Sequence, residues 1–163
     1  MATQNKNLSL FNKSKVPSAQ GIRFGIVVSD WNKEITANLL EGTKTTLLEC
    51  GALEQHITIM EVPGSFELVF GAKLLSKQNL DVIICLGSVI QGETKHFDFV
   101  CNAVAAGIKD LNITLGIPVI FGVLTDNTLQ QAKNRSGGKL GNKGVEAAIT
   151  AIRMANLNSK KTI

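Results

Sequence analysis

"DVIICLGSVIQGETKHFDFV", residues 81–100, joins an apolar run to an amphipathic one through a short polar segment. The run at 81–87 is rich in β-branched residues, which is typical of a strand buried on both faces. Val100, Val104 and Ile108 then recur at helical spacing. The stretch therefore predicts a strand followed by a helix, with an unusual amount of polar chemistry at the junction.

The same alternation extends through the chain in both directions. Further strands are predicted at 22–28, 56–62 and 117–125, and further helices at 35–50, 65–77, 127–135 and 142–154. Continuous apolar strands separated by helices favour a parallel sheet that is covered on both faces. We therefore expect an α/β fold, a three-layer flavodoxin-like sandwich with a four-stranded parallel sheet.

Two of the predicted helices carry more specific expectations. The segment 65–77 is apolar on more than one side, so we expect that helix to be extensively covered. Asp126 or Thr125 is expected to cap the helix at 127–135, because both residue types accept hydrogen bonds from a helix N-terminus.

The length of 163 residues suits one domain, which we place at 21–157. Residues 1–20 are polar and contain Pro17, so they are expected to form a flexible N-terminal arm, and 158–163 a polar tail. No apolar run approaches the roughly 18 residues of a membrane span, and the arm has no stretch of signal-peptide length. Membrane insertion and secretion are not expected.

The cysteine content and the charge limit which cellular compartment and which partners are expected. Cys50, Cys85 and Cys101 lie far apart, which favours reduced, buried thiols in a cytoplasmic protein. The formal charge of +4 comes from five terminal lysines, since the other twelve basic residues face thirteen acidic ones. A nucleic-acid-binding face would be expected within the folded body, so no nucleic acid partner is predicted.

Ligands of open parallel sheets bind outside the carboxyl ends of the strands. Four segments should meet at that edge: 29–32, 61–67, 87–96 and 122–127. In the third, Gly92 permits close backbone approach, and the following helix start with Thr94 is a candidate anion site or a plain N-terminal cap. His96, expected about one turn into that helix, is a candidate proton-transfer group or a surface histidine.

Other residues at this edge also allow two interpretations each. Trp31 stacks on a flat heterocycle or is structural, and Asn32 bonds such a ring or caps a helix. Glu67 binds substrate hydroxyls or only favours the helix dipole. Arg135 begins the cationic, glycine-rich "RSGGKLGNKG", which suits a phosphate clamp or a solvated turn, and Glu146 is close enough in sequence to orient it.

Taken together, these segments resemble the lumazine synthase family. The likeness covers about residues 21–156 and is carried by "VVSDWN" with "LLEGT", "VPGSFEL", "GSVIQGETKHFDFVC", "PVIFGVLT" and "GNKGVEAA". The resemblance implies condensation of 5-amino-6-(D-ribitylamino)uracil with 3,4-dihydroxy-2-butanone 4-phosphate to give 6,7-dimethyl-8-ribityllumazine, the penultimate step of riboflavin biosynthesis. It implies a transferase that needs no metal or organic cofactor, and the two lone histidines and scattered cysteines offer no metal-ligand spacing.

The resemblance also implies a role for each matching residue. Trp31 and Asn32 match the ring-stacking segment, Ser65, Phe66 and Glu67 the ribityl and pyrimidine segment, and Ser88, Val89 and Ile90 the strand end at the heterocycle. Gly92, Glu93 and Thr94 match the phosphate loop, and His96 the proton-transfer histidine. Arg135 matches the phosphate-binding arginine, Glu146 the acid that orients it, Lys143 a basic residue beside the ribityl chain, and Phe121 an aromatic from a neighbouring subunit.

Two residues depart from the family pattern. Asn134 stands where a glutamate is more usual, which removes a charge near the site. Glu93 stands where alanine is frequent, so its carboxylate must point away from the phosphate.

The resemblance implies a homo-oligomer with active sites between adjacent subunits of a pentamer. The short "RSGGKLGNKG" favours a 60-subunit icosahedral shell, Val16–Ala19 is expected to reach a neighbour's sheet, and riboflavin synthase is a candidate cargo.

The sequence argues against two other classes of protein. A non-catalytic lumazine- or flavin-binding relative, or a shell protein, would need neither His96 nor Arg135. A receiver-type signalling module would need an Asp at the end of the third strand, where this chain has Gly87-Ser88.

Overall fold

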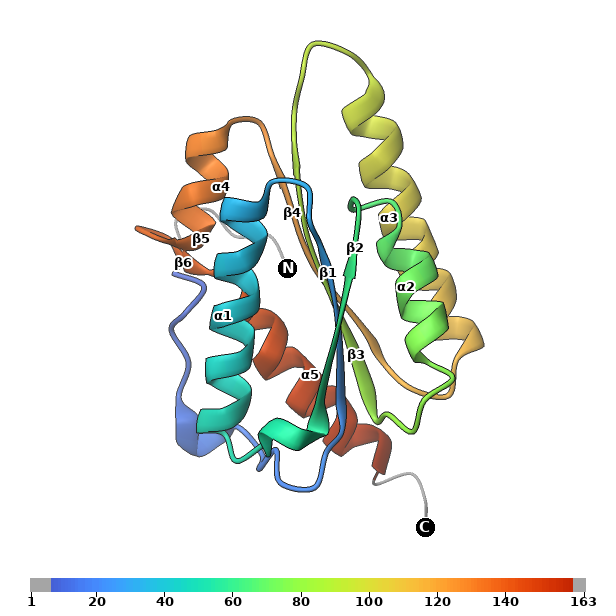
Figure 1. Cartoon of the computed structure of the whole chain (residues 1–163). Coiled ribbons are helices and arrows are strands. Elements are labelled where there is room, and N and C mark those ends of the chain that lie inside the picture. Colours follow the sequence, from blue (N-terminus) through green and yellow to red (C-terminus); the bar gives the residue numbers. More distant parts are fainter. Residues whose placement is uncertain (1–6, 160–163) are drawn as a thin grey trace.

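Four parallel strands form the centre of the structure, a computed structural model that describes residues 7–159 (Figure 1). They are β1 (Phe24–Ser29), β2 (Ile57–Val62), β3 (Val82–Ile90) and β4 (Val119–Asp126). The sheet order is β2-β1-β3-β4, and every pairing in it is parallel. The predicted fold class is therefore confirmed. Residues 1–6 and 160–163, including three of the five terminal lysines, lie outside the described part of the chain.

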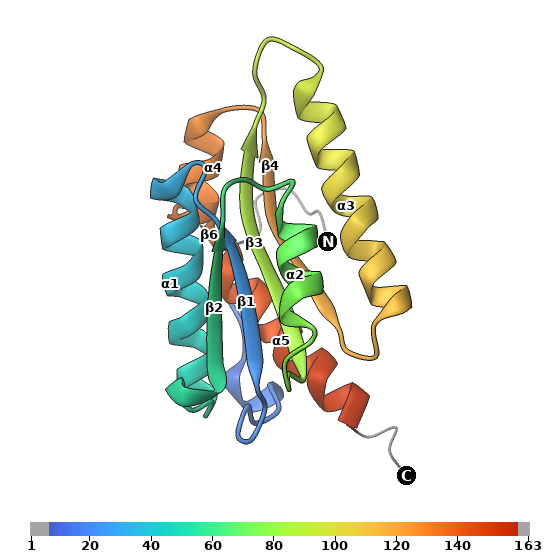
Figure 2. The ribbon, with the colours of Figure 1, turned by 45° about the vertical axis from the view of Figure 1, so that its right-hand side comes forward.

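Helices cover both faces of this sheet (Figures 1 and 2). On one face lie α1 (Lys33–Glu49), α4 (Leu129–Arg135) and α5 (Lys143–Ser159), and on the other α2 (Leu68–Leu75) and α3 (His96–Thr114). Two short antiparallel strands, β5 (Ser136–Gly138) and β6 (Gly141–Asn142), connect α4 to α5, and the 3-10 turns are η1 (Lys13–Lys15) and η2 (Glu54–His56).

The central strands are buried on both sides because each supplies side chains to two apolar clusters. Ile26 belongs to the cluster under α1 and α5, whereas its neighbour Val27 belongs to the cluster under α2 and α3. Burying an aliphatic side chain of this size contributes about 1.5–3 kcal/mol. This explains why the strands read as continuous apolar runs rather than as alternating ones.

Three sequence expectations at element ends need correction. Strand β3 continues through Ile90, so Ser88 is part of the strand. Helix α3 begins at His96, so that histidine is the first helical residue and does not lie one turn inside. The cap of α4 is Thr128, whose hydroxyl accepts from the N–H of Gln131 at 3.2 Å, whereas Asp126 ends β4.

The expected cover of the segment 65–77 is also wrong for the isolated chain. Helix α2 is shorter, and its side away from the sheet is open, with Phe70 69% exposed and Leu74 exposed as well. On the neighbouring helix α3, Phe99 and Ile113 are exposed in the same way. One side of the molecule therefore presents large apolar side chains to its surroundings.

Contacts with the body extend into both terminal segments. Ala19 is fully buried, and its N–H donates to the Cys50 carbonyl at 2.9 Å, while the N–H of Leu8 donates to the Leu140 carbonyl at 2.7 Å. Leu8 and Ala19 thus contact the body of their own chain, whereas most residues between them are exposed. Helix α5 continues past residue 157, where we expected the polar tail to begin. Between residues 7 and 159, no helix is long and apolar enough to cross a membrane.

Close packing of α1 on α5 generates a first prediction. A β-carbon at Gly144 would overlap the carbonyl oxygen of Leu39, and the Thr43 hydroxyl donates to the Gly144 carbonyl at 3.1 Å. We expect Gly144→Ala to lower the free energy of unfolding by roughly 1–3 kcal/mol, because overpacking outweighs the gain in helix propensity. Urea unfolding followed by circular dichroism measures the difference.

The matched control is Gly116→Ala, since a β-carbon there meets nothing within 4 Å. This variant should stay within about 0.5 kcal/mol of the parent chain. Equal stability of both variants would show that the approach of α1 to α5 does not depend on Gly144.

Candidate active site

The carboxyl ends of the four parallel strands lie together at the upper end of the sheet in Figure 1. The strand order changes direction between β1 and β3, so their following loops leave toward opposite faces. Each of the four segments that we expected at this edge contains the last residue of one of these strands. The topology therefore brings the four segments to one edge, as predicted.

Asn32 bridges the gap between the two diverging loops. Its φ of 60° is in the left-handed region, and its side-chain amide donates to the Ser88 carbonyl at 3.0 Å. The backbone N–H of Trp31 donates to the Pro63 carbonyl at 3.0 Å. These bonds tie the loop after β1 to β3 and to the loop after β2. The Trp31 side chain lies at the carboxyl edge of the sheet and is 72% exposed.

Buried polar atoms without partners are concentrated at this edge. Among the described residues, the buried side-chain atoms with no hydrogen-bond partner are Ser29 Oγ, Ser65 Oγ, Ser88 Oγ, Asp126 Oδ2 and His56 Nδ1, and all but the last lie at the carboxyl edge. Leaving such a group unpaired costs about 1–3 kcal/mol. A bound polar molecule can offset that cost, which makes this edge a candidate binding site.

The segment after β2 contributes a buried hydroxyl and two residues around it. Ser65 is buried, and a β-carbon at Gly87 would lie 2.7 Å from its Oγ, so only glycine leaves room for that hydroxyl. Phe66 is exposed, and Glu67 occupies the N-cap position of α2 without a side-chain capping bond. Beyond Ser88, the side chains of Val89 and Ile90 are half-buried.

The loop between β3 and α3 exposes its polar residues. Gly92, Glu93 and Thr94 are exposed, and a β-carbon at Gly92 would meet nothing within 4 Å. The Thr94 hydroxyl accepts from the N–H of His96 at 3.3 Å, although the N-cap position of α3 is Lys95. The N–H of Asp98 donates to the Lys95 carbonyl at 3.1 Å, so the N–H of Phe97 and the positive end of the 19-residue helix remain for an anion beside the exposed His96.

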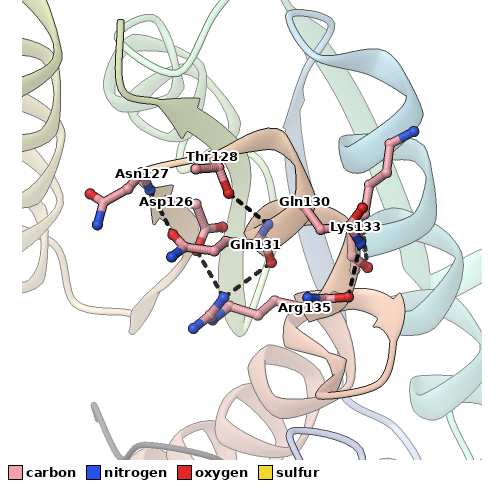
Figure 3. A network of polar contacts seen from close by, with 9 residues as sticks. Asp126, Asn127, Thr128, Gln130, Gln131, Lys133 and Arg135 are labelled. Carbon is pink, nitrogen blue, oxygen red and sulfur yellow. Dashed lines mark hydrogen bonds and ion pairs between the residues drawn. The ribbon is translucent and has the colours of Figure 1, made fainter.

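Arg135, at the end of α4, reaches back to the end of β4 (Figure 3). Its Nη1 lies 3.3 Å from Asp126 Oδ1 and donates to the Gln131 carbonyl at 3.1 Å. Asp126 is only 5% exposed, and burial raises the pKa of its carboxyl although the Arg135 charge lowers it. Asp126 is thus the carboxylate that contacts Arg135 in this chain.

This pairing corrects the expectation that Glu146 orients Arg135. Glu146 accepts from Lys143 at 2.6 Å, because the two residues are three positions apart on α5. Sequence reasoning considered Asp126 only as a helix cap. The pattern Thr128-x-x-Gln131, a capping-box signature, could have shown that the cap lies further along and that Asp126 has another use. Asn134 accepts from the Gln130 side chain at 3.1 Å.

One predicted site residue lies away from this edge. Phe121 is in the middle of β4, paired with Cys85, about 16 Å along the strand from Asp126. Its side chain is 37% exposed. Lys143 opens α5 and is largely buried beside Glu146. A single chain therefore brings Trp31, Ser65, Ser88 and His96 to one edge but does not bring Phe121 there. No group of three or more metal-ligating side chains occurs between residues 7 and 159.

Comparison with known proteins matches this chain along nearly its whole length. Residues 21–159 match the family profile described as 6,7-dimethyl-8-ribityllumazine synthase. Proteins of that name from Flavobacterium johnsoniae and Christiangramia forsetii are 57% and 55% identical, over 100% and 96% of this chain and 86% and 95% of their own length. The protein of that name from Parabacteroides distasonis is 51% identical, over 98% of this chain and all of its own length.

The raised pKa of Asp126 predicts how stability depends on pH. A carboxyl that binds its proton more tightly when folded makes the folded state less stable as pH rises through the acidic range. As the pH rises above 3.8, the ordinary pKa of an aspartate, the free energy of unfolding should therefore decrease more in the parent chain than in Asp126→Asn. Urea unfolding at several pH values between about 4 and 7 measures the difference between the two chains.

Because all other titrating groups are shared, the difference reports Asp126 alone. If the parent chain instead gained stability relative to Asp126→Asn as pH rose, the attraction of Arg135 would outweigh burial. The pKa direction given above would then be wrong.

Proposed function

This chain belongs to the 6,7-dimethyl-8-ribityllumazine synthase family, and from that premise we propose how its residues divide the reaction. The enzyme is a transferase that condenses 5-amino-6-(D-ribitylamino)uracil with 3,4-dihydroxy-2-butanone 4-phosphate. The product is 6,7-dimethyl-8-ribityllumazine, the penultimate compound of riboflavin biosynthesis. The main support for the proposed division is that ring-stacking, hydroxyl and anion-binding groups meet at one sheet edge.

The pyrimidine ring stacks on Trp31 and lies over the ends of β1 and β3. Exposure of the indole supports this role, because a flat heterocycle can cover it. The orphaned hydroxyls of Ser65 and Ser88 supply polar partners below the ring. Val89 and Ile90 contact the heterocycle, while Phe66, Glu67 and Lys143 receive the ribityl chain. Asn32 acts indirectly, by holding the Trp31 loop against β3.

The phosphate of the second substrate binds between the loop 92–94 and Arg135. Helix α3 begins beside this loop, and the positive end of a helix favours negative charge. Gln91, which precedes the loop, donates its N–H to the Asp126 carbonyl at 2.9 Å. Since Asp126 contacts Arg135, the loop and the arginine are linked through one residue. Exposed Glu93 points away from the anion.

His96 transfers protons while the two substrates are held in place. The 5-amino group attacks the ketone to form a Schiff base with release of water, phosphate is eliminated, and ring closure onto the second carbonyl completes the product with loss of a second water. Holding two reactants in register is itself a large part of such catalysis. The position of His96 at the start of α3, next to the proposed phosphate loop, supports the assignment.

The active site is completed by an adjacent subunit in a pentamer, and twelve pentamers form a shell of 60 subunits. Support comes from the exposed apolar side of α2 and α3, with Phe70, Leu74, Phe99 and Ile113. Phe121, too distant from its own edge, is available to close a neighbour's site. Riboflavin synthase is the proposed cargo, and the cytoplasm the proposed location.

The role of His96 is tested with His96→Ala. Turnover should fall on the order of 100-fold, a typical loss for one acid–base group. Binding of an unreactive ring analogue, measured by quenching of Trp31 fluorescence, should change less than threefold because stacking is retained. Lys95→Ala is the control, as Lys95 is exposed and adjacent. Unchanged turnover in His96→Ala would show that another group moves the protons.

Assembly is tested by placing a charge on the apolar side of α2. Phe70→Asp should shift the solution mass, measured by light scattering, from a multiple of 17.5 kDa toward the single chain, because a carboxylate disfavours an apolar interface. Asn79→Asp is the control, since it adds the same charge at an exposed polar position after α2. A parent chain that is itself monomeric would refute the shared active site.

A further inference from the structure

We propose that Asp126 is a positioning residue for Arg135, holding one end of the guanidinium so that its other edge faces the substrate phosphate. The inference rests on the proposed function, because it takes Arg135 to be the phosphate ligand. Asp126 belongs neither to the proposed binding site for the pyrimidine ring nor to the phosphate loop. It also replaces Glu146, which is engaged by Lys143.

The contacts of the guanidinium are distributed unevenly (Figure 3). Nη1 lies 3.3 Å from Asp126 Oδ1, with which it forms an ion pair, and it donates a hydrogen bond to the Gln131 carbonyl at 3.1 Å. Within the described part of the chain, Nε and Nη2 of Arg135 make no hydrogen bond or ion pair. An arginine binds phosphate best through two parallel N–H donors on one edge. Fixing Nη1 leaves Nε and Nη2 as such a pair.

Asp126 can hold that end firmly because its own position is determined from several sides. It is the last residue of β4, paired with Ile90 of β3, and its carbonyl accepts from the N–H of Gln91. Its side chain is almost completely buried. The carboxylate is therefore attached to the rigid sheet, whereas Arg135 ends a helix of only seven residues.

A second set of bonds fixes the carbonyl that shares Nη1. Gln131 is held by the cap of α4, since its N–H donates to Thr128 Oγ1, and its side-chain oxygen accepts from the N–H of Asn127 at 2.9 Å. The start of α4 and the end of β4 thus form one hydrogen-bonded unit. Arg135 is oriented by two acceptors that belong to this unit.

Lys133, the other charged residue of α4, does not compete with Arg135 for the Asp126 carboxylate. Lys133 pairs with Glu34 of α1 at 2.8 Å, on the side of α4 that faces that helix. A buried carboxylate needs a partner to offset its lost hydration, and Arg135 is the cation in contact with Asp126. The pair therefore keeps the guanidinium at the edge when phosphate is absent.

The test is Asp126→Asn, which keeps the size of the side chain and removes its charge. The Michaelis constant for the phosphorylated butanone and the inhibition constant of inorganic phosphate should both rise about 10- to 100-fold, the cost of a mispositioned binding group. The Michaelis constant for the pyrimidine should stay within twofold, because the ring site does not involve Arg135. This split between substrates is what a merely structural role would not produce.

Glu34→Gln is the matched control. It also converts a carboxylate paired with α4 into an amide, but the carboxylate is paired with Lys133 and not with Arg135. Phosphate inhibition should remain as in the parent chain. In the background of Arg135→Ala, Asp126→Asn should add no further loss of phosphate affinity, because Asp126 acts through the guanidinium.

The outcomes separate the proposal from its premise. If Arg135→Ala left phosphate inhibition unchanged, the phosphate role of Arg135 and this proposal would both be wrong. If Arg135→Ala weakened phosphate binding but Asp126→Asn did not, the positioning role alone would be wrong. Tighter phosphate binding in Asp126→Asn would show that Asp126 competes for Arg135, and equal rises in both Michaelis constants would indicate a general structural defect.

Discussion

The parallel pairing of β1 with β3 is the constraint on which the rest of the molecule depends. Both strands are buried on both faces, so their backbone groups are satisfied within the sheet. A right-handed crossover toward β2 must carry α1 over one face, and the crossover toward β4 must carry α3 over the other. The loops after β1 and β3 consequently diverge. The Asn32 bond to Ser88 spans the space that they leave, and the aromatic, hydroxyl and anion-binding groups of the proposed site are arranged around it.

Stability and function are separated along the length of the sheet. Its middle packs apolar side chains into two clusters, whereas its carboxyl edge buries Ser29, Ser65, Ser88 and Asp126 with unpaired oxygen atoms. Such groups oppose folding, and the two apolar clusters offset them. The single fully buried cysteine, Cys85, illustrates the contrast. Burial in the apolar middle raises the pKa of its thiol to about 12, so it behaves as a core residue without reactive chemistry.

The exposed aromatic side chains have a common explanation in the proposed assembly. Trp31 lies at the mouth of the edge, Phe70 and Phe99 lie on the side of α2 and α3, and Phe121 lies midway along β4. None of these positions is required by the two apolar clusters. We propose that a substrate ring covers the first and that neighbouring subunits cover the others. In this view, the fold of one chain prepares surfaces that become useful only when subunits meet.

Periodicity along the sequence was enough to determine the class of fold, because strands buried on both faces and one-sided helices leave different patterns of apolar residues. It also determined that 29–32, 61–67 and 87–96 would meet, since parallel strands share one carboxyl edge. Pairings between side chains depended on the tertiary structure. Glu146 and Asp126 were both available to Arg135 by sequence, but three positions along α5 bring Glu146 to Lys143, and the end of β4 brings Asp126 to Arg135. The start of α3, the cap at Thr128 and the exposed side of α2 also became clear only from the tertiary structure. A sequence pattern indicates which residues are buried, but it does not indicate which partner each polar group contacts.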